Sequence, residues 1–404
     1  MVLHGRLLYA WLPLLVFLLQ VFHGSFAKGC CSDNNGGCGK NALCSEDPTT
    51  SAVKCTCKTG YTNTGCDAKV VCKDSCTINN GGCGPRAACS HHAKTNAVIC
   101  TFNIPANAKW EQNGVTVAGG HGQGGSTNQL NWPSGLFVDD DQTVLIADNW
   151  NHRIMQWKNG DTTNGQVVAG GNGQGKGLHQ CNSPIDVLID KETDSLIICD
   201  RGNQRVVRLS RRSGTTQGEV LIDNIDFFGL AMDEQRYLYV SDTKKHEVRR
   251  YQFGEKNGTL VAGGNGKGDG LNQLNYPTYL FVDRQQNVYV SDTDNHRVMK
   301  WNKGAKEGIV VAGGQGYGTA LTQLNSPYGL FVDTLGTVYV ADEVNNRVMR
   351  WTQGATQGTV IAGGNGRGAG ANQLNVPIGL SFDRHGNLYV VDAGNHCVQR
   401  FSIE

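Results

Sequence analysis

The sequence has almost no net charge and, after its first 27 residues, no long apolar run. Lys and Arg number 36 against 35 Asp and Glu, so no overall field draws the protein toward nucleic acid or an anionic membrane. No segment beyond residue 27 approaches the roughly 18 apolar residues that a transmembrane helix needs. We therefore expect neither a nucleic-acid partner nor a membrane span.

The one apolar run opens the chain. Residues 7–22 follow Arg6, and Ser25-Phe-Ala27 fits the small-x-small cleavage rule. We interpret residues 1–27 as a signal peptide and predict a secreted, extracellular protein. An uncleaved anchor is the alternative, but a run of this length that contains Pro13 is short for a span.

One phrase is written six times after residue 130. Its first copy contains Trp132-Pro-Ser-Gly-Leu-Phe-Val-Asp139, Val144-Leu-Ile-Ala-Asp148, Asn151-His-Arg-Ile154 and Gln166-Val-Val-Ala-Gly-Gly171. A period near 50 residues predicts a repeat architecture. The second Asp of the phrase recurs at Asp148, Asp200, Asp242, Asp292, Asp342 and Asp392.

Each copy contains four short runs rich in β-branched and aromatic residues, which indicates four antiparallel strands and leaves no room for helices. Runs such as Ile309-Val-Val-Ala312 are apolar on consecutive residues, so both faces of each sheet are covered. Six such sheets close into a ring as a β-propeller. The last copy lacks a fourth strand, and Val115-Thr-Val-Ala-Gly-Gly120 can supply it. We predict that residues 115–118 pair with the C-terminal strand and latch the ring.

The words Pro-x-Gly-Leu-x-x-Asp, Val-Tyr-Val-x-Asp and Asn-His-Arg-Val resemble the NHL repeat over residues 115–404. The resemblance implies an all-β fold with a six-bladed propeller that serves as a scaffold, usually for binding protein and in some relatives RNA or a small substrate. Kelch repeats share the Gly-Gly pair and the length but lack Asn-His-Arg-Val. Fold alone does not choose among these functions.

Twelve of the fifteen cysteines fall between residues 30 and 100, a density typical of disulfide-stapled modules in an oxidising compartment. The spacing in residues 28–71 resembles an EGF-like domain, and residues 72–102 resemble a truncated copy. Cys30 and Cys72 are left over and could pair with one another. The resemblance implies the pairs Cys31–Cys44, Cys38–Cys55, Cys57–Cys66, Cys76–Cys89 and Cys83–Cys100.

Residues 103–114 are expected to be a linker between these modules and the propeller. Calcium-binding EGF-like domains carry acidic and amide residues before the first cysteine, whereas Lys28-Gly-Cys30 stands here. Zinc on the Cys-x-Cys step is a further alternative, but secretion favours disulfides. We predict no cofactor and no metal site.

Strand order predicts which loops share a face of the propeller. Loops between second and third strands, such as residues 149–152, lie on the same face as the Gly-rich loops before the first strands, such as residues 119–132. We call this the loop-rich face and its opposite the turn face. Loops on a rigid scaffold commonly carry function, so we predict that an extracellular protein binds there.

Aromatic residues that differ between copies are the candidate contacts on the loop-rich face, because such residues dominate contact energetics. Packing against neighbouring loops is their alternative role. The candidates are Trp132, Trp150, Tyr276, Tyr317 and Tyr328.

Residues that recur in most copies indicate structure rather than chemistry. We expect the recurring histidine to make local hydrogen bonds rather than to bind metal. The recurring Asp and Arg, such as Asp148 and Arg153, are expected to pair within a blade, and a recurring tryptophan, such as Trp157, to lie in the core. The histidines are His152, His246, His296 and His396.

The third copy departs most from the pattern, because residues 221–229 have neither the Gly-rich loop nor the Pro. Basic residues cluster in sequence around it. They are interpreted as a solvated face, or as a patch for an anionic partner such as a sulfated glycan. The patch comprises Arg205, Arg208, Arg211, Arg212, Lys244 and Lys245.

A secreted lyase or hydrolase is the alternative function. Peptidyl-hydroxyglycine amidating lyase is a similar propeller whose zinc-binding histidines tend to follow the Pro of a first strand, and no histidine holds those positions here. A lactonase-type site needs acidic ligands that converge in the central channel, whereas the repeated Asp residues stand at turns. We predict no catalytic residues. The positions that lack histidine are Ser134, Ile185, Thr278, Tyr328 and Ile378.

Two covalent features remain. Asn257-Gly-Thr259 is the only Asn-x-Ser/Thr sequon, and we predict glycosylation of Asn257. The cysteine count is odd, so we predict that Cys181 pairs with Cys199 and leaves Cys397 free. The alternative is three free, buried thiols.

Overall fold

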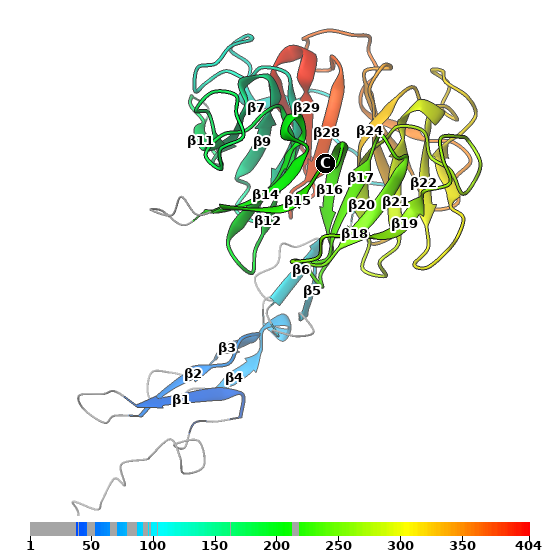
Figure 1. Ribbon diagram of the computed structural model, residues 1–404. Coiled ribbons are helices and arrows are strands. Elements are labelled where there is room, and N and C mark those ends of the chain that lie inside the picture. The colour runs from blue at the N-terminus through cyan, green and yellow to red at the C-terminus, as the bar shows by residue number, and fades with distance from the viewer. Residues whose placement is uncertain are drawn as a thin grey trace, which may run out of the picture. The chain divides into compact units, whose positions relative to one another are not determined.

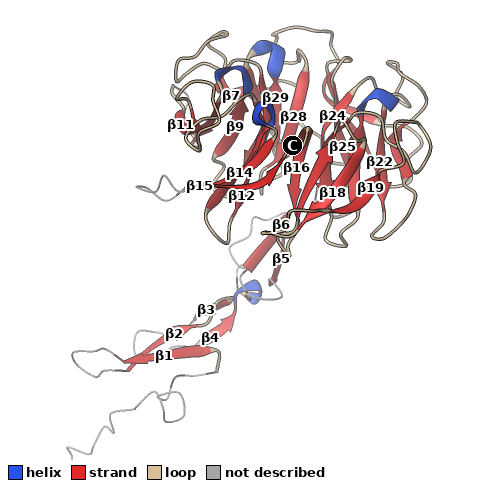
Figure 2. Cartoon of the chain, viewed as in Figure 1, coloured by secondary structure: helices blue, strands red, loops and turns tan. Residues whose placement is uncertain are grey.

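The computed structural model describes residues 38, 40–46, 53–64, 71–78, 87–91, 96, 98–102, 104–161, 163–211 and 218–404. The chain divides into two compact units, Met1–Thr101 and Phe102–Glu404. Strands dominate the regular structure of both units (Figures 1 and 2). Over the described ranges, none of the helices has the length and hydropathy needed to cross a membrane.

The described part of the second unit contains six four-stranded antiparallel sheets, which are the blades of a propeller. In the first blade, β8 (Pro133–Val138), β9 (Val144–Asp148), β10 (Arg153–Trp157) and β11 (Gln166–Gly170) are hydrogen-bonded in chain order. Blades two to five repeat this order. Their strands are β12 (Pro184–Asp190), β13 (Ser195–Asp200), β14 (Arg205–Ser210) and β15 (Gly218–Asp223); β16 (Phe227–Met232), β17 (Leu238–Asp242), β18 (Glu247–Tyr251) and β19 (Thr259–Gly263); β20 (Pro277–Val282), β21 (Val288–Asp292), β22 (Arg297–Trp301) and β23 (Ile309–Gly313); β24 (Pro327–Val332), β25 (Val338–Asp342), β26 (Arg347–Trp351) and β27 (Thr359–Gly363).

The sixth blade closes the ring with a strand from the other end of the propeller sequence. It consists of β28 (Pro377–Phe382), β29 (Leu388–Asp392) and β30 (Cys397–Phe401), with β7 (Val115–Gly119) paired to β30. Figure 1 shows β7 beside the red C-terminal strands. The first strands also contact one another around the ring, including β28 with β8. The predicted six-bladed fold and its latch are confirmed.

The core lies between neighbouring blades. Trp157, Trp301 and Trp351 are each at most 2% exposed, as predicted for the recurring tryptophan. Trp351 belongs to a cluster that joins the fourth and fifth blades, in which Tyr289 of β21 packs with Val340 of β25. Burial of both faces of every sheet therefore supplies the main stabilisation of the ring.

Residues 104–114, expected to be a linker, pack against the propeller instead. The Trp110 indole is buried and lies 5.9 Å from the Tyr339 ring and 6.0 Å from the Phe382 ring. Its Nε1 donates to the Gly386 carbonyl at 2.9 Å. Burial of an indole with its N–H satisfied is worth several kcal/mol, and this outweighs the polar, Pro-containing character that indicated a linker.

Three short β-ladders and one helical turn form the described part of the first unit. The strand β1 (Ala42–Glu46) pairs with β2 (Val53–Cys57), and β3 (Tyr61–Asn63) pairs with β4 (Cys72–Asp74). The helical turn η2 (Ser75–Thr77) follows. The last ladder joins β5 (Ala87–His91) to β6 (Val98–Phe102).

Disulfides link these ladders. Cys38–Cys55 and Cys76–Cys89 are present, as the EGF-like resemblance implied. The implied pair of Cys57 is wrong, because Cys57 bonds Cys72 across a Cα separation of 5.5 Å. The ladder of β3 and β4 places Cys72 opposite Asn63 and returns the chain to the end of β2. Cys72 is therefore not available to Cys30.

The remaining cysteine predictions of this unit fall partly outside the described residues. Cys44 is disulfide-bonded, but its expected partner Cys31 lies outside the described residues. The same holds for Cys66 and Cys83, and for the expected signal peptide. The disulfides that are present make the unit compatible with EGF-like modules and with an oxidising compartment.

Candidate functional site

The recurring Asp and Arg form a buried ion pair in four blades. Nε of Arg153 lies 2.7 Å from Oδ2 of Asp148. The guanidinium also donates to the backbone carbonyls of Gly125 and Ser126 in the Gly-rich loop, and Asp148 accepts from the backbone N–H of Asn131. The pair thus holds the loop on its blade, which confirms the structural interpretation. The other three are Arg205–Asp200, Arg297–Asp292 and Arg347–Asp342.

The recurring histidine connects one blade to the next. Nδ1 of His152 accepts a hydrogen bond from the backbone N–H of Ser183 at 3.0 Å, with His152 in the left-handed region at φ +53°. Asn346 makes the same contact through Oδ1 to Val376. The imidazoles therefore make hydrogen bonds, as predicted, but these act as clamps between neighbouring blades rather than as local contacts of the loop. The others are His246 to Tyr276, His296 to Ser326 and His396 to Trp132.

The six first strands enclose a central channel with a cavity of about 250 Å³. The third residue of the first strand lines this cavity in the second, fourth, fifth and sixth blades. In four of the six blades this third residue is glycine. At Gly229 an added Cβ would lie 2.7 Å from the Thr278 carbonyl, so a side chain does not fit. In the second and fourth blades the third residue is Asp186 and Tyr279, and both line the cavity. Among the described residues that line the cavity, these two are the only titratable ones.

Asp186 is a buried carboxylate held by backbone donors. It accepts from the N–H of Val187 at 3.0 Å and from the N–H of Leu230, in the next blade, at 3.0 Å. Burial raises the pKa of Asp186 to about 7, against these two hydrogen bonds. Removal from water disfavours the charged form, so this carboxyl exchanges its proton near neutral pH.

Three aromatic rings cover the loop-rich end of the channel. The Phe228 ring lies 5.4 Å from the rings of both Tyr279 and Tyr328, in edge-to-face contacts. Tyr279 is buried, and burial raises its pKa well above the usual range. Its hydroxyl has no hydrogen-bond partner among the described residues. We call Phe228, Tyr279 and Tyr328 the aromatic plug.

Arg201, which follows the second strand of the second blade, contacts the plug and residues of the third and fourth blades. Its guanidinium carbon lies 5.2 Å from the centre of the Phe228 ring, its Nη2 donates to the Tyr276 hydroxyl at 3.2 Å, and its Nε lies 3.6 Å from Oδ1 of Asp226. Tyr276 and Tyr328, both predicted as partner contacts, are half-buried in this arrangement. Their main contacts are inside the protein, which is the alternative that the sequence had left open.

The other predicted aromatic contacts remain accessible. Trp150 is 56% exposed, and its indole lies 5.5 Å from that of Trp132. The Trp132 ring in turn stands edge-on to His396 at 6.0 Å, and the backbone N–H of Trp132 donates to Nδ1 of that imidazole. The two indoles thus form a supported pair on the first blade, with one of them facing solvent.

Tyr317 is the most exposed of the aromatic candidates. It is 72% exposed in the Gly-rich loop before β24, and its ring lies 5.6 Å from His296. Tyr317 and Trp150 belong to different blades but to loops of the same class. Helical turns such as η4 (Asn149–Asn151) and η6 (Thr293–Asn295), blue in Figure 2, mark this end of the propeller.

The predicted basic patch does not form one free surface. Arg205 is buried in its ion pair, Arg208 pairs with Glu219, and Arg211 lies 3.3 Å from Asp139 at the turn face. Arg205 and Arg211 stand at opposite ends of β14, about 20 Å apart at the usual rise of a strand. Acidic neighbours neutralise most of the group, because the antiparallel register sets Glu and Asp opposite Arg. Lys245 lies 3.7 Å from Asp242, Lys244 is exposed, and Arg212 falls outside the described residues.

The predicted bridge between Cys181 and Cys199 is wrong. Both thiols are free and buried, as is that of Cys397. The sulfur of Cys181 faces Gly170 of the first blade, whereas Sγ of Cys199 lies 3.5 Å from the Phe228 carbonyl of the third blade. The two thiols point to opposite neighbours. Burial raises the pKa of Cys181 to about 12, so it behaves as a small apolar residue.

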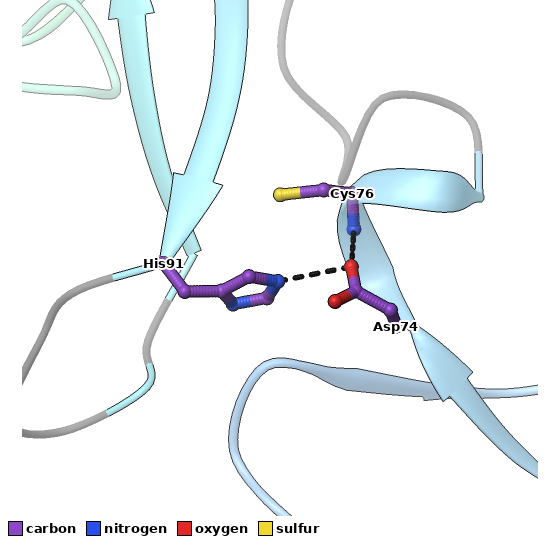
Figure 3. A group of neighbouring side chains, drawn as sticks. All are labelled: Asp74, Cys76 and His91. Carbon is purple, nitrogen blue, oxygen red and sulfur yellow. Dashed lines mark hydrogen bonds and ion pairs between the residues drawn. The ribbon is translucent and has the colours of Figure 1, made fainter.

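One group of potential metal ligands lies in the first unit (Figure 3). Nε2 of His91 is 2.9 Å from Oδ1 of Asp74, which also accepts from the N–H of Cys76. The sulfur of Cys76 is committed to its disulfide with Cys89 and cannot act as a thiolate ligand. The hydrogen bond between Asp74 and His91 lowers the pKa of the carboxyl and raises the pKa of the imidazole. The group is therefore an ion pair that caps η2.

These observations define the second unit as a six-bladed β-propeller. The NHL repeat family matches residues 130–157 and 374–401, which are parts of the first and last blades. Two of the six blades therefore match the NHL repeat, the family that the repeated words resemble. No curated protein matches the chain.

Solved structures of similar fold differ in function. A protein of unknown function from Bacteroides thetaiotaomicron has TM-score 0.59 at 16% identity, covering 90% of each chain. An auxiliary nutrient binding protein from the same organism has TM-score 0.57 at 16% identity, covering 77% of this chain and 81% of its own. A gluconolactonase from Xanthomonas campestris has TM-score 0.51 at 15% identity, covering 68% and 87%. At these identities the similarity shows the fold alone.

Proposed function

We propose that this protein is a secreted binding scaffold that holds an extracellular protein on the loop-rich face of its propeller. The observation that carries the proposal is the pair of Trp132 and Trp150. The Trp150 indole is 56% exposed. Covering it with a partner would remove apolar surface from water, which is favourable. Tryptophan and tyrosine are the residues most enriched at interaction hot spots.

The contacts that hold Trp132 and Trp150 favour a role of this pair in recognition. Trp132 is held by the His396 clamp, and the backbone N–H of Trp150 donates to the Asn131 carbonyl at 3.1 Å. The main chain of both residues is therefore held, and their indoles contact one another at 5.5 Å, which reduces the conformational entropy that binding would cost. Tyr317, on another loop of the same class, offers a second anchor.

Secretion enters the proposal through the disulfides of the first unit and the apolar N-terminal run. A disulfide-dense module is stable only in an oxidising compartment. An enzymatic function of the lyase or hydrolase type receives no specific support, because the channel contains one carboxylate where a metal site would need several ligands that converge.

The test is capture of extracellular proteins by the immobilised full-length protein and by two variants. Trp150→Ala removes the exposed indole, and Leu335→Ala removes a side chain that is 50% exposed at the turn face. We expect the unmodified protein and Leu335→Ala to retain the same partner and Trp150→Ala to lose it. The expected loss of binding free energy is about 2 kcal/mol or more. Equal capture by all three proteins would contradict the proposal.

A further inference from the structure

The described lining of the channel cavity contains one carboxyl side chain and no cationic one. Asp186 is 7% exposed and lines the cavity, and among the described residues it is held by backbone N–H groups rather than by a cation. A buried carboxylate without a cationic partner is costly. Four of the six equivalent positions are glycine, so this carboxylate is not a feature that the blades share.

A second polar group in the same wall has no hydrogen-bond partner at all. The Tyr279 hydroxyl is buried and has no partner among the described residues, although buried tyrosine hydroxyls usually find one. Tyr279 and Asp186 occupy the same position of their first strands, two blades apart. An incoming group that donates hydrogen bonds would satisfy both oxygens.

The rest of the cavity is apolar and rich in aromatic rings. Phe137, Phe281 and Phe331 line its other end, with Ala231 and Met232 between them and the small Ser381 beside them. These residues are half-buried, whereas the aromatic plug closes the loop-rich end. A ligand therefore enters from the turn face and reaches Asp186 at the closed end.

We propose that the central channel binds a small organic cation, a protonated aliphatic amine, whose ammonium group pairs with Asp186 and whose carbon chain lies against the phenylalanines. Aromatic faces attract cations, and the carbon chain gains from burial. An anion would meet the carboxylate in a wall without positive charge. A calcium ion fits less well, because it takes six to eight oxygen ligands and Asp186 is the only carboxylate among the described residues of this wall.

This inference is independent of the proposed function, since the site opens on the face opposite the exposed indoles. The experiment measures binding of n-butylammonium to the full-length protein by titration calorimetry, with n-butanol and n-butyrate as probes of matched size. We expect saturable binding of n-butylammonium alone. Binding of n-butyrate or n-butanol with equal affinity would overturn the proposal.

Two variants locate the site, and a third is their control. Asp186→Asn is expected to weaken n-butylammonium binding by about thirtyfold or more, the usual effect of removing one buried charge of a pair. Tyr279→Phe, which removes only the hydroxyl, should weaken it severalfold. The control, Asp194→Asn, is the same substitution at a side chain that is 49% exposed and lies outside the cavity. It should leave binding unchanged.

A thermal melt of each variant separates loss of the site from loss of the fold. If Asp186→Asn does not fold, Tyr279→Phe still decides the question. Unchanged affinity in every folded variant of the channel would show that the amine binds elsewhere and would overturn the proposal.

Discussion

The two units of this protein are stabilised by opposite means. In the first unit, Ala42 and Ser75 are the buried residues among those whose burial is described. Three disulfides between described cysteines link its short ladders, and Cys44 is disulfide-bonded as well. In the propeller, large aromatic and aliphatic side chains are buried between every pair of blades, and its three described cysteines are free. A chain that cannot build a core uses covalent links, whereas one that repeats a sheet six times has no need of them.

This difference predicts the largest effect, which is the response to a reducing agent. Each disulfide of a small module contributes roughly 2 to 4 kcal/mol, so reduction should unfold the first unit while the melting temperature of the propeller stays unchanged. Calorimetry with and without dithiothreitol checks this. Titration of denatured, unreduced protein should also find the three thiols Cys181, Cys199 and Cys397. Fewer thiols, or a propeller that melts lower on reduction, would contradict the comparison.

The propeller depends instead on closure of its ring. A chain that begins at residue 121 lacks β7 and the Trp110 segment, and we expect it to melt lower by about 10 °C or more, because a buried indole and a paired strand are lost together. A chain that begins at residue 103 keeps both and is the control. The two melting temperatures are compared by circular dichroism, and equal values would show that the latch is dispensable.

Within a blade, the buried ion pair should matter far more than a surface pair. Arg297→Leu leaves Asp292 buried without its partner and should lower the free energy of unfolding by about 3 to 5 kcal/mol. Arg284→Leu breaks a pair with Glu234 in which both side chains are over 40% exposed, and should cost at most about 1 kcal/mol. Urea unfolding of both variants provides the measurement. Similar losses would mean that the Asp–Arg pair is not structural.

The smallest expected effect concerns Asn257, which is exposed in the turn between β18 and β19. A glycan there touches no core residue, so stability should change by no more than about 0.5 kcal/mol. Protein secreted from eukaryotic cells should lose mass on deglycosylation, and Asn257→Gln should abolish that shift. No mass change in the unmodified protein would argue against glycosylation of Asn257 and against passage through the secretory pathway.

Repeated residues were predictable, and single residues were not. The period of Asp148 and its equivalents indicated six sheets, the missing last strand indicated β7, and the recurring tryptophan indicated the core. Asp186 and Tyr279 were missed, although a signal existed: they replace a glycine that four copies share. Recurring residues reveal the fold, whereas these two positions matter because their residues do not recur.

Predictions about which segments contact one another were the ones that failed. The pairs Cys57–Cys66 and Cys181–Cys199, and the linker over residues 103–114, each rested on spacing or composition along the chain. The actual partners depend on which way a side chain points from its strand. Cys181 and Cys199 occupy the same blade yet face opposite neighbours, and a one-dimensional pattern contains no such direction.

The amino-acid sequence by itself determined the number of blades, their strand order and the closure of the ring, because a period of about 50 residues with alternating strands and turns admits one way to bury every apolar face. Only the tertiary structure decided what lies at the centre. The channel wall takes residues from all six blades. Whether they form a sealed plug, a lone carboxylate or an open cavity depends on distances across the ring rather than along the chain.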